Sequence, residues 1–353
     1  MARSQALSAA PASARARVLI VDDSSVARAV LTRMVEEAAA CSVAAAVPDI
    51  AGALRFLAAD RVDVILLDLE MPGIHGLVGL PDIIAAGAGA KVLVVSSAAG
   101  EGAAATIEAL ALGAADTLVK PGRYVTAGSF AMTLAEKLIR LAEQSEPVLR
   151  PATAQPAAHH DFDVVAIGAS TGGIHALNSL LQALPATFRK PIVITQHLPA
   201  SFIPYFAGQV ATATGRMCQV AADKMVIGDD MILVAPGDAH VTAVPLPKGR
   251  AAIRLNRDPV ANGNMPSVDP MFESFADCFG PRLLAVVLSG MGRDGFAGAR
   301  RVRSAGGTVV AQDQASSVVW GMPGAVAAAG LANAVLTPGA IGDYIAAQHG
   351  VAA

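Results

Sequence analysis

Short apolar runs alternate with helical patterns along the whole chain. Runs of this kind precede polar residues near positions 22, 68, 96 and 120, and again near positions 170, 197 and 294. Such runs have the length of buried strands, and the segments between them repeat their apolar residues with helical spacing. Strands that alternate with helices form parallel sheets covered by helices on both faces. The pattern therefore predicts an α/β fold in which the polar residues after the strands meet at one sheet edge.

An alanine- and proline-rich segment divides this pattern into two domains. The periodicity is lost in the run EPVLRPATAQPAAHH, and the 353 residues exceed what one core of ordinary size holds. We therefore predict a disordered tail at 1–15, a first domain at 16–141, a flexible linker at 142–160 and a second domain at 161–353. Each domain is long enough to bury its own core, and each is expected to be a doubly wound parallel sheet.

The second domain carries three residues that suit nucleophilic catalysis. Ser170 lies in VVAIGASTGG, a G-x-S-x-G turn whose small residues lift one hydroxyl above the sheet edge. His197 follows the run PIVIT, and Asp294 follows LLAVVLSG. A serine needs a base to remove its proton, and an imidazole base needs a carboxylate to hold its tautomer. The alternative is that GASTGG binds phosphate at a helix N-terminus, although Gln196 and His197 stand where a dinucleotide site has its ribose-binding acid.

The first domain brings three carboxylates to one sheet edge. Asp22 and Asp23 follow one apolar run, and Asp68 follows another. Such a cluster is unfavourable without a cation, and Mg²⁺ is the expected ion because it prefers carboxylate and water oxygens. Asp68 is then the acceptor of a phosphoryl group, and Ser96 and Lys120 would bind its oxygens. The alternative is a set of ordinary acidic surface turns.

Both domains resemble known families. The runs VDDSSVAR, LDLEMPG, TIEALALGA and LVKP, between residues 16 and about 122, are similar to a two-component receiver domain. The region 161–349 resembles the catalytic domain of the chemotaxis protein-glutamate methylesterases through the runs GASTGG, QHL, LVAPGDAHV, MPSVDPMFESFA, LSGMGRDG, AQDQASSVVWGMPGA and AGL. The resemblance implies a five-stranded receiver sheet, with Ser170 as nucleophile, His197 as base and Asp294 as orienting acid. It adds Thr171 and the backbone amide of Met291 as neighbours of the developing oxyanion.

The resemblance also implies a phosphorylation-regulated hydrolase. It would demethylate glutamate methyl esters on a methyl-accepting chemoreceptor, releasing methanol, and would deamidate receptor glutamines. A chemotaxis sensor histidine kinase would be the source of the phosphoryl group, and phosphorylation of Asp68 with Mg²⁺ would relieve inhibition by the receiver. The esterase site would need no cofactor. Two other classes remain open, which are a phosphorylation-gated binding module with a vestigial triad and a nucleotide-binding enzyme that uses the GASTGG turn.

Two positions of the first domain depart from the usual receiver pattern. Thr117 stands three residues before Lys120, where receivers usually have an aromatic residue, so a switch that buries an aromatic ring is not expected. The segment VGLPDIIAAGAGA should hold the third helix and contains Pro81. Proline is tolerated in the first turn of a helix, and we expect Pro81 there.

Composition narrows the possible partners. No apolar run reaches the roughly 18 residues that span a bilayer, so no membrane insertion is predicted. The cysteines are odd in number and widely spaced, which predicts reduced thiols in a cytoplasmic protein; they are Cys41, Cys218 and Cys278. A net charge of -3 and an aromatic content of 4% predict no nucleic-acid partner. His240 is expected at a strand end, either lining the cleft or as a structural histidine.

Overall fold

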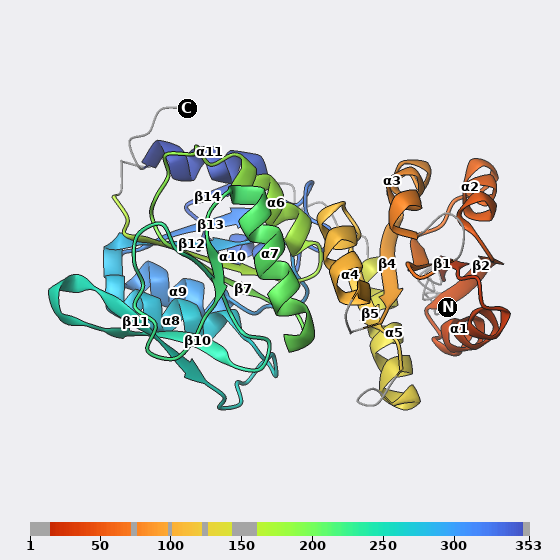
Figure 1. Ribbon diagram of the computed structural model, residues 1–353, viewed down its shortest axis with the longest axis horizontal. Helices are drawn as coiled ribbons and strands as arrows, with labels where there is room; N and C mark the ends of the chain where they lie inside the picture. The colour runs from red at the N-terminus through yellow and green to blue at the C-terminus, as the bar shows by residue number, and fades with distance from the viewer. Residues whose placement is uncertain (1–14, 72–75, 98–100, 122–125, 143–160, 349–353) are drawn as a thin grey trace, which may run out of the picture.

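The computed structural model describes residues 15–71, 76–97, 101–121, 126–142 and 161–348. The predicted tail and linker lie outside this range, except for Arg15 and Ala142 at their borders. Two α/β units lie side by side along the longest axis of the molecule (Figure 1). None of the described helices is both long and apolar enough to cross a membrane.

The first unit is a five-stranded parallel sheet, as predicted. Its strand order is β2-β1-β3-β4-β5. The elements in chain order are β1 (Ala16–Val21), α1 (Ser25–Glu37), β2 (Cys41–Val47), α2 (Ile50–Ala59), β3 (Val64–Asp68), α3 (Gly76–Ala86), β4 (Lys91–Ser96), α4 (Glu101–Ala111), β5 (Asp116–Val119) and α5 (Ala127–Ala142).

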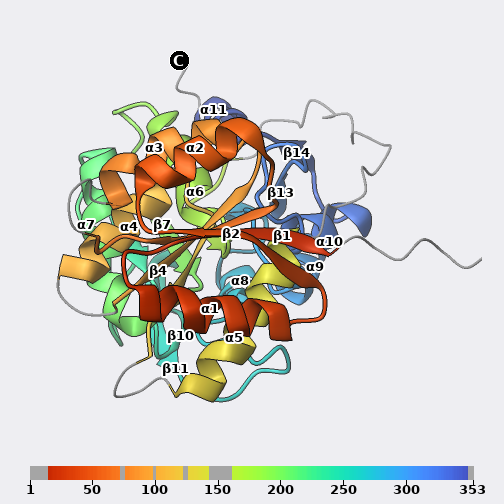
Figure 2. The ribbon, with the colours of Figure 1, turned by 90° about the vertical axis from the view of Figure 1, so that its right-hand side faces the viewer.

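Helices cover both faces of this sheet. Successive side chains of a strand point to opposite faces, so each strand contributes to two cores. In β1, Leu19 and Val21 join the core beneath α2, α3 and α4, whereas Val18 and Ile20 join the core beneath α1 and α5. Figure 2 shows α2 and α3 on one side of the sheet and α1 and α5 on the other. Because helices cover both faces, the residues at the two ends of the strands are the ones left for functional sites.

The position predicted for Pro81 is wrong. It is the sixth residue of α3 and lies inside the helix. A proline there has no N–H to bond to the carbonyl of Leu77. Pro81 is exposed, so water can satisfy that carbonyl.

The second unit is a seven-stranded parallel sheet of order β14-β13-β12-β6-β7-β9-β8. Its longer elements include β6 (Val164–Ala169), α6 (Gly173–Gln182), β7 (Ile192–Gln196), α7 (Ile203–Thr214), α8 (Val268–Phe279), β12 (Leu283–Val287), α9 (Phe296–Ser304), β13 (Thr308–Gln312), α10 (Met322–Ala328) and α11 (Pro338–Gln348). The shorter elements are β8 (Cys218–Val220), β9 (Ile232–Val234), β14 (Ala334–Leu336) and the 3-10 helices η1 (Ala200–Phe202), η2 (Pro247–Gly249) and η3 (Gly280–Arg282).

Helices cover both faces of this sheet too. Leu177 of α6, Phe206 of α7 and Ile341 of α11 belong to one core, and Phe272 of α8 and Val302 of α9 belong to the other. The expectation of strands alternating with helices fails at β10 (His240–Pro245) and β11 (Ala251–Asn256), which form an antiparallel hairpin. Its turn contains the 3-10 helix η2, in which Lys248 and Gly249 both have positive φ, so the chain reverses without an α-helix between the two strands.

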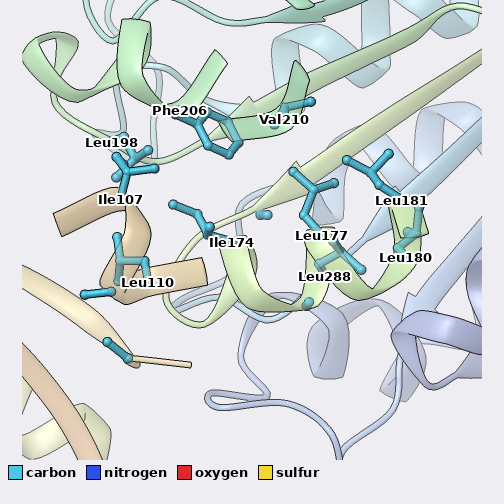
Figure 3. Packing of buried hydrophobic residues seen from close by; sticks show 14 of the residues in the cluster. Ile107, Leu110, Ile174, Leu177, Leu180, Leu181, Leu198, Phe206, Val210 and Leu288 are labelled. Carbon is cyan, nitrogen blue, oxygen red and sulfur yellow. The ribbon is translucent and has the colours of Figure 1, made fainter. Parts of the chain in front are cut away.

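The two units share one continuous apolar contact. Ile107 and Leu110 of α4 lie against Ile174 of α6 and Leu198 after β7 in Figure 3. The carbonyl of Ala111 also lies 3.0 Å from Nδ1 of His175 on α6. The end of α4 and the start of β5 thus dock on the second unit, close to the turn that carries Ser170.

Candidate active site

Ser170 occupies a sharp turn between a buried strand and a helix. It follows β6, whose residues are all buried, and its N–H donates to the carbonyl of Ser289 at 3.0 Å. Gly172 caps α6 with a φ of 74°, a left-handed conformation that suits glycine. A side chain on Gly290 would come within 2.9 Å of Cβ of Ser170. These glycines let the loop after β12 approach the serine.

The three predicted catalytic residues follow three neighbouring strands. Ser170 follows β6, His197 follows β7 and Asp294 lies in the loop between β12 and α9, and β6 lies between the other two strands. Nε2 of His197 donates to Oδ2 of Asp294 at 2.7 Å. Within the described ranges, neither the Ser170 hydroxyl nor Nδ1 of His197 makes a hydrogen bond. Because Nε2 carries the proton toward the carboxylate, Nδ1 is the nitrogen that can accept one.

The Asp294 carboxylate lies on the N-terminus of α8. Oδ2 accepts the N–H of Val268 at 2.8 Å, and Oδ1 accepts the N–H of Asp269 at 3.1 Å. Oδ1 also accepts from the Ser267 hydroxyl at 2.7 Å and from Nδ2 of Asn262 at 2.9 Å. The first N–H groups of a helix lack partners within the helix and carry partial positive charge. Asp294 therefore caps α8 in place of the usual N-cap side chain.

These contacts keep Asp294 ionised although it is only 1% exposed. Burial alone would raise its pKa, but the hydrogen bond and charge of His197, with the Val268 N–H and the Ser267 hydroxyl, lower the pKa to about 2. A permanently charged carboxylate accepts but never donates a hydrogen bond. It therefore fixes which tautomer the neutral His197 ring adopts, with the proton on Nε2.

A second carboxyl group lies next to this anion. Burial raises the pKa of Asp269 to about 6, and the charge of Asp294 adds to this, while the Gly298 N–H opposes it. Oδ1 of Asp269 accepts that N–H at 2.8 Å. Asp269 also lines the cleft that holds Ser170 and His197.

The cleft has a volume of about 610 Å³ and both units line it. Ser170, Thr171, His197 and Met291 line one wall, so the structure brings the residues predicted for catalysis and for the oxyanion to one cavity. Another wall is helix α5 of the first unit, through Glu136, Lys137 and Arg140. Helix α5 of the first unit therefore borders the same cavity as the predicted catalytic residues.

The first unit contacts the catalytic turn through the start of β5. The Thr171 hydroxyl donates to Oδ2 of Asp116 at 2.6 Å, and Lys137 pairs with the same oxygen at 2.6 Å. The Gly172 N–H donates to the carbonyl of Ala115 at 2.7 Å. The first unit thus accepts hydrogen bonds from the two residues that follow Ser170, namely from the Thr171 hydroxyl and the Gly172 N–H.

The predicted acid cluster forms at the opposite end of the first sheet. Oxygens of Asp22, Asp23 and Asp68 lie within 4.8 Å of one another, and Lys120 pairs with both oxygens of Asp68 at 2.8 and 2.9 Å. Burial raises the pKa of Asp22, and the nearby charge of Asp68 adds to the rise. Three carboxylates at this spacing fit a hard divalent cation.

Ser96 lies beside this cluster with its hydroxyl turned inward. It is fully buried and accepts a hydrogen bond from the Thr106 hydroxyl at 2.6 Å. The neighbouring Ser97 donates to Glu70, which lies 3.7 Å from Lys120. Sequence reasoning did not single out Glu70 or Thr106.

The sequence reasoning also missed the cradle around Asp294. A serine before an apolar helical run is an N-cap signal, so Ser267 in MPSVDPMF could have been found. Asn262 lies in a loop without any such signal. His240 is structural, since its Nδ1 accepts the Ser267 N–H at 2.9 Å and its Nε2 donates to the Asp258 carbonyl at 3.1 Å.

Known proteins are similar to the chain over nearly its whole length. The family model described as CheB methylesterase matches residues 165–345, and that of the response regulator receiver domain matches residues 18–125. Protein-glutamate methylesterase/protein-glutamine glutaminase 2 of Caulobacter vibrioides is 42% identical over 344 residues, which cover 94% of this chain and 98% of the relative. Protein-glutamate methylesterase/protein-glutamine glutaminase 1 of Paramagnetospirillum magneticum is 39% identical, and the match covers 96% of this chain and 97% of the relative.

A solved structure matches the second unit. The crystal structure of the Thermotoga maritima CheB methylesterase catalytic domain has a TM-score of 0.51 and 33% identity, and the match covers 52% of this chain and 97% of that one. The coverage corresponds to the seven-stranded unit with the Ser170 turn.

Replacing Asp269 by asparagine should change how stability depends on pH. An unfolded carboxyl group titrates near pH 3.9, and Asp269 in the folded protein has a pKa of about 6. The folded state therefore binds the proton more tightly, and wild-type stability should fall as pH rises from about 4 to 6. Asparagine keeps the oxygen that accepts the Gly298 N–H and cannot ionise. The variant should gain, relative to wild type, on the order of 2 kcal/mol between these pH values.

Urea unfolding at several pH values, followed by the fluorescence of the single tryptophan, Trp320 in the second unit, measures this difference. Asp277→Asn is the matched control, because Asp277 is an exposed carboxylate on the same helix. Parallel pH curves for Asp269→Asn and wild type would contradict the assignment of the raised pKa.

Proposed function

Because this chain belongs to the CheB methylesterase family and carries a receiver domain, we propose that it hydrolyses glutamate methyl esters on a methyl-accepting chemoreceptor. The observation that carries the proposal is the hydrogen bond between His197 and the buried Asp294 carboxylate, in the same cleft that Ser170 lines. Deamidation of receptor glutamines uses the same acyl chemistry, and we include it in the proposed function.

The chemistry follows from the site. Nδ1 of His197 takes the proton of Ser170 as its hydroxyl oxygen attacks the ester carbonyl, and Asp294 stabilises the imidazolium that forms. The Thr171 hydroxyl and the Met291 N–H are the proposed donors to the oxyanion. His197 then gives the proton to the leaving methanol, and water hydrolyses the glutamyl-enzyme by the same route in reverse.

The alternatives have less support. In the GASTGG turn, the Gly173 N–H donates to the Ser170 carbonyl and the Gly172 N–H to Ala115, so these amides are not free for a phosphate. A vestigial site would not need Ser170, His197 and Asp294 together, whereas all three are present, and Asp294 orients His197 in addition to capping α8.

Asp68 is the proposed phosphorylation site. Mg²⁺ would be held by Asp22, Asp23 and Asp68, and when bound it neutralises the phosphoryl charge. Lys120 already contacts both oxygens of Asp68 and would pair with the added group. A sensor histidine kinase is the proposed phosphoryl donor, and the cytoplasm is the compartment in which such a kinase and the receptor tail are both present.

We also propose that the receiver inhibits the hydrolase until Asp68 is phosphorylated. Two observations support inhibition, namely the Asp116 carboxylate on Thr171 and the wall that α5 adds to the cleft. A substrate oxyanion and the Asp116 carboxylate would compete for the same Thr171 hydroxyl. An interface of this kind within one chain is usually modest in area, so one phosphoryl group can shift it.

Ser170→Ala, His197→Ala and Asp294→Asn should each slow methanol release roughly 10³-fold or more, because the three residues act as one unit. The double variant of Ser170 and His197 should be no slower than the worse single variant. Methanol released from a methylated receptor is the measurement. Ser179→Ala is the control, since among the described residues that hydroxyl on α6 donates to the His175 carbonyl of its own helix. A double variant much slower than either single variant would contradict a shared mechanism.

Asp68→Ala should abolish phosphoryl uptake from acetyl phosphate, and removal of Mg²⁺ by a chelator should do the same in wild type. Incorporation of labelled phosphate is the measurement. Asp82→Ala serves as the control, because Asp82 is an exposed acid on α3. Incorporation at wild-type stoichiometry in Asp68→Ala would remove Asp68 from this role.

Asp116→Ala should raise methanol release by the unphosphorylated chain about fivefold, since one interface hydrogen bond contributes about 1 kcal/mol. The gain on adding acetyl phosphate should shrink accordingly. Asp82→Ala should leave both rates unchanged. If Asp116→Ala is folded and no faster than wild type without phosphorylation, the Thr171 contact does not contribute to inhibition.

A further inference from the structure

Ser289, in the loop after β12, contacts the catalytic turn with both its backbone and its side chain. The residue is fully buried. Its carbonyl accepts the Ser170 N–H at 3.0 Å, and its hydroxyl donates to the Thr171 carbonyl at 2.7 Å. The same hydroxyl accepts the Val319 N–H at 3.1 Å. Ser289 therefore joins the nucleophile and the residue after it to the loop between β13 and α10.

The hydroxyl has one proton to donate, and two carbonyls lie within its reach. The Thr171 carbonyl at 2.7 Å is nearer than the Val319 carbonyl at 3.2 Å. The Val319 carbonyl also accepts the Gly290 N–H at 3.1 Å, whereas the Thr171 carbonyl has no second donor among the described residues. The Ser289 hydroxyl is therefore the group that holds the Thr171 carbonyl.

The loop between β13 and α10 also sets the direction of the Met291 N–H. The Gly290 carbonyl accepts the N–H of Gly321 at 3.1 Å and that of Met322 at 2.9 Å. A peptide bond is planar and trans, so the Met291 N–H points away from this fixed carbonyl. Met291 lines the cleft together with Ser170, and no described residue accepts a hydrogen bond from its N–H. This N–H is therefore free to bind an oxygen in the cleft.

The catalytic turn and the loop after β12 lie in close contact around Ser289. A Cβ added to Gly172 would come within 2.9 Å of the Ser289 hydroxyl, and one added to Gly290 would come within 2.9 Å of Cβ of Ser170. Alanine at position 289 would leave the Thr171 carbonyl and a backbone N–H without their common partner. The turn and the loop could then shift relative to one another.

We propose that Ser289 is a positioning residue for the oxyanion site. It acts through Thr171 and through the loop that carries Met291, and it does not touch the substrate. This rests on the proposed function, in which those two residues donate to the oxyanion. The negative charge develops on the carbonyl oxygen only after Ser170 attacks, so correctly spaced donors lower the barrier without tightening substrate binding.

The Ser289 contact lies within the second unit and does not depend on the receiver. In the docked arrangement the receiver also holds the turn, because Asp116 accepts from the Thr171 hydroxyl and Ala115 accepts from the Gly172 N–H. The proposed activation removes both of these contacts. The Ser289 hydroxyl then remains as the partner of Thr171, so its contribution is best measured with the phosphorylated protein.

The test uses the full-length protein with Mg²⁺ and acetyl phosphate. Methanol release from a methylated chemoreceptor cytoplasmic domain is measured as a function of the domain's concentration. Ser289→Ala should lower kcat at least about tenfold, because a small displacement of catalytic groups has a large effect on rate. KM should stay at the wild-type value, since the lost interaction acts only in the transition state. The pH profile of kcat should also be unchanged, because the hydrogen bond between His197 and Asp294 does not involve Ser289.

Ser274→Ala is the matched control for a purely structural effect. The Ser274 hydroxyl also bridges two backbone groups of the second unit, since it accepts the Ala243 N–H at 3.0 Å and donates to the Pro270 carbonyl at 2.7 Å. Both variants should lower the urea midpoint by similar amounts, but Ser274→Ala should keep the wild-type kcat. If Ser289→Ala does not fold, Ser289→Cys carries the same expectation, because its thiol fills the site and is only a weak donor.

Three results would overturn the proposal. They are a wild-type kcat in the folded Ser289 variant, a raised KM or displaced pH profile in place of the lowered kcat, and an equal loss of kcat in Ser274→Ala. Wild-type protein that releases no methanol would instead refute the proposed function itself.

Discussion

The second unit depends on one buried anion at a helix N-terminus. The Asp294 carboxylate accepts hydrogen bonds from four places, namely the start of α8, the Asn262 loop, the His197 ring and the N–H of Gly295. Removing any donor would leave the buried negative charge less stabilised, and the pKa of Asp294 would rise. The same contacts close the first turn of α8 and join the loop after β12 to the end of β7. The same carboxylate therefore supports the first turn of α8 and the orientation of the His197 ring.

Asp269 indicates the limit of this arrangement. The helix terminus supplies enough positive potential for one carboxylate, and Asp294 takes it with the help of His197. Burial raises the pKa of the next carboxyl group along α8, that of Asp269, and the charge of Asp294 adds to the rise, while the N–H of Gly298 opposes it. Two acids a few ångströms apart thus differ widely in acidity because their hydrogen-bond donors are unequally divided.

Much of the fold and of the site could be predicted from the sequence, for a simple reason. Apolar runs mark parallel strands, and the residues that follow them share one edge, so Ser170, His197 and Asp294 could be brought together without coordinates. The β10–β11 hairpin and the inner position of Pro81 could not be predicted in this way, because both depart from the regular alternation. The contact of Asp116 with Thr171 was also inaccessible, because it joins surfaces of two units whose docking no local pattern encodes.

That docking places both ends of one short strand at chemically active positions. Lys120, which follows β5, pairs with Asp68, and Asp116, which begins β5, accepts the hydrogen bond of Thr171. Between them Thr117 is 7% exposed and its hydroxyl has no partner among the described residues, and it borders a cavity of about 210 Å³ at the interface. Under the proposed regulation, a phosphoryl group on Asp68 would shift Lys120 from the Asp68 oxygens that it now contacts to those of the added group. The four-residue strand β5 would carry this shift toward Asp116. The cavity beside Thr117 leaves β5 room to move. The movement does not depend on burying an aromatic ring, because Thr117 stands at the position where receivers usually have one. The interface donors on the Ser170 turn contribute about 1 kcal/mol each, so a displacement that lengthens two of them is sufficient to change the population of the docked state several-fold.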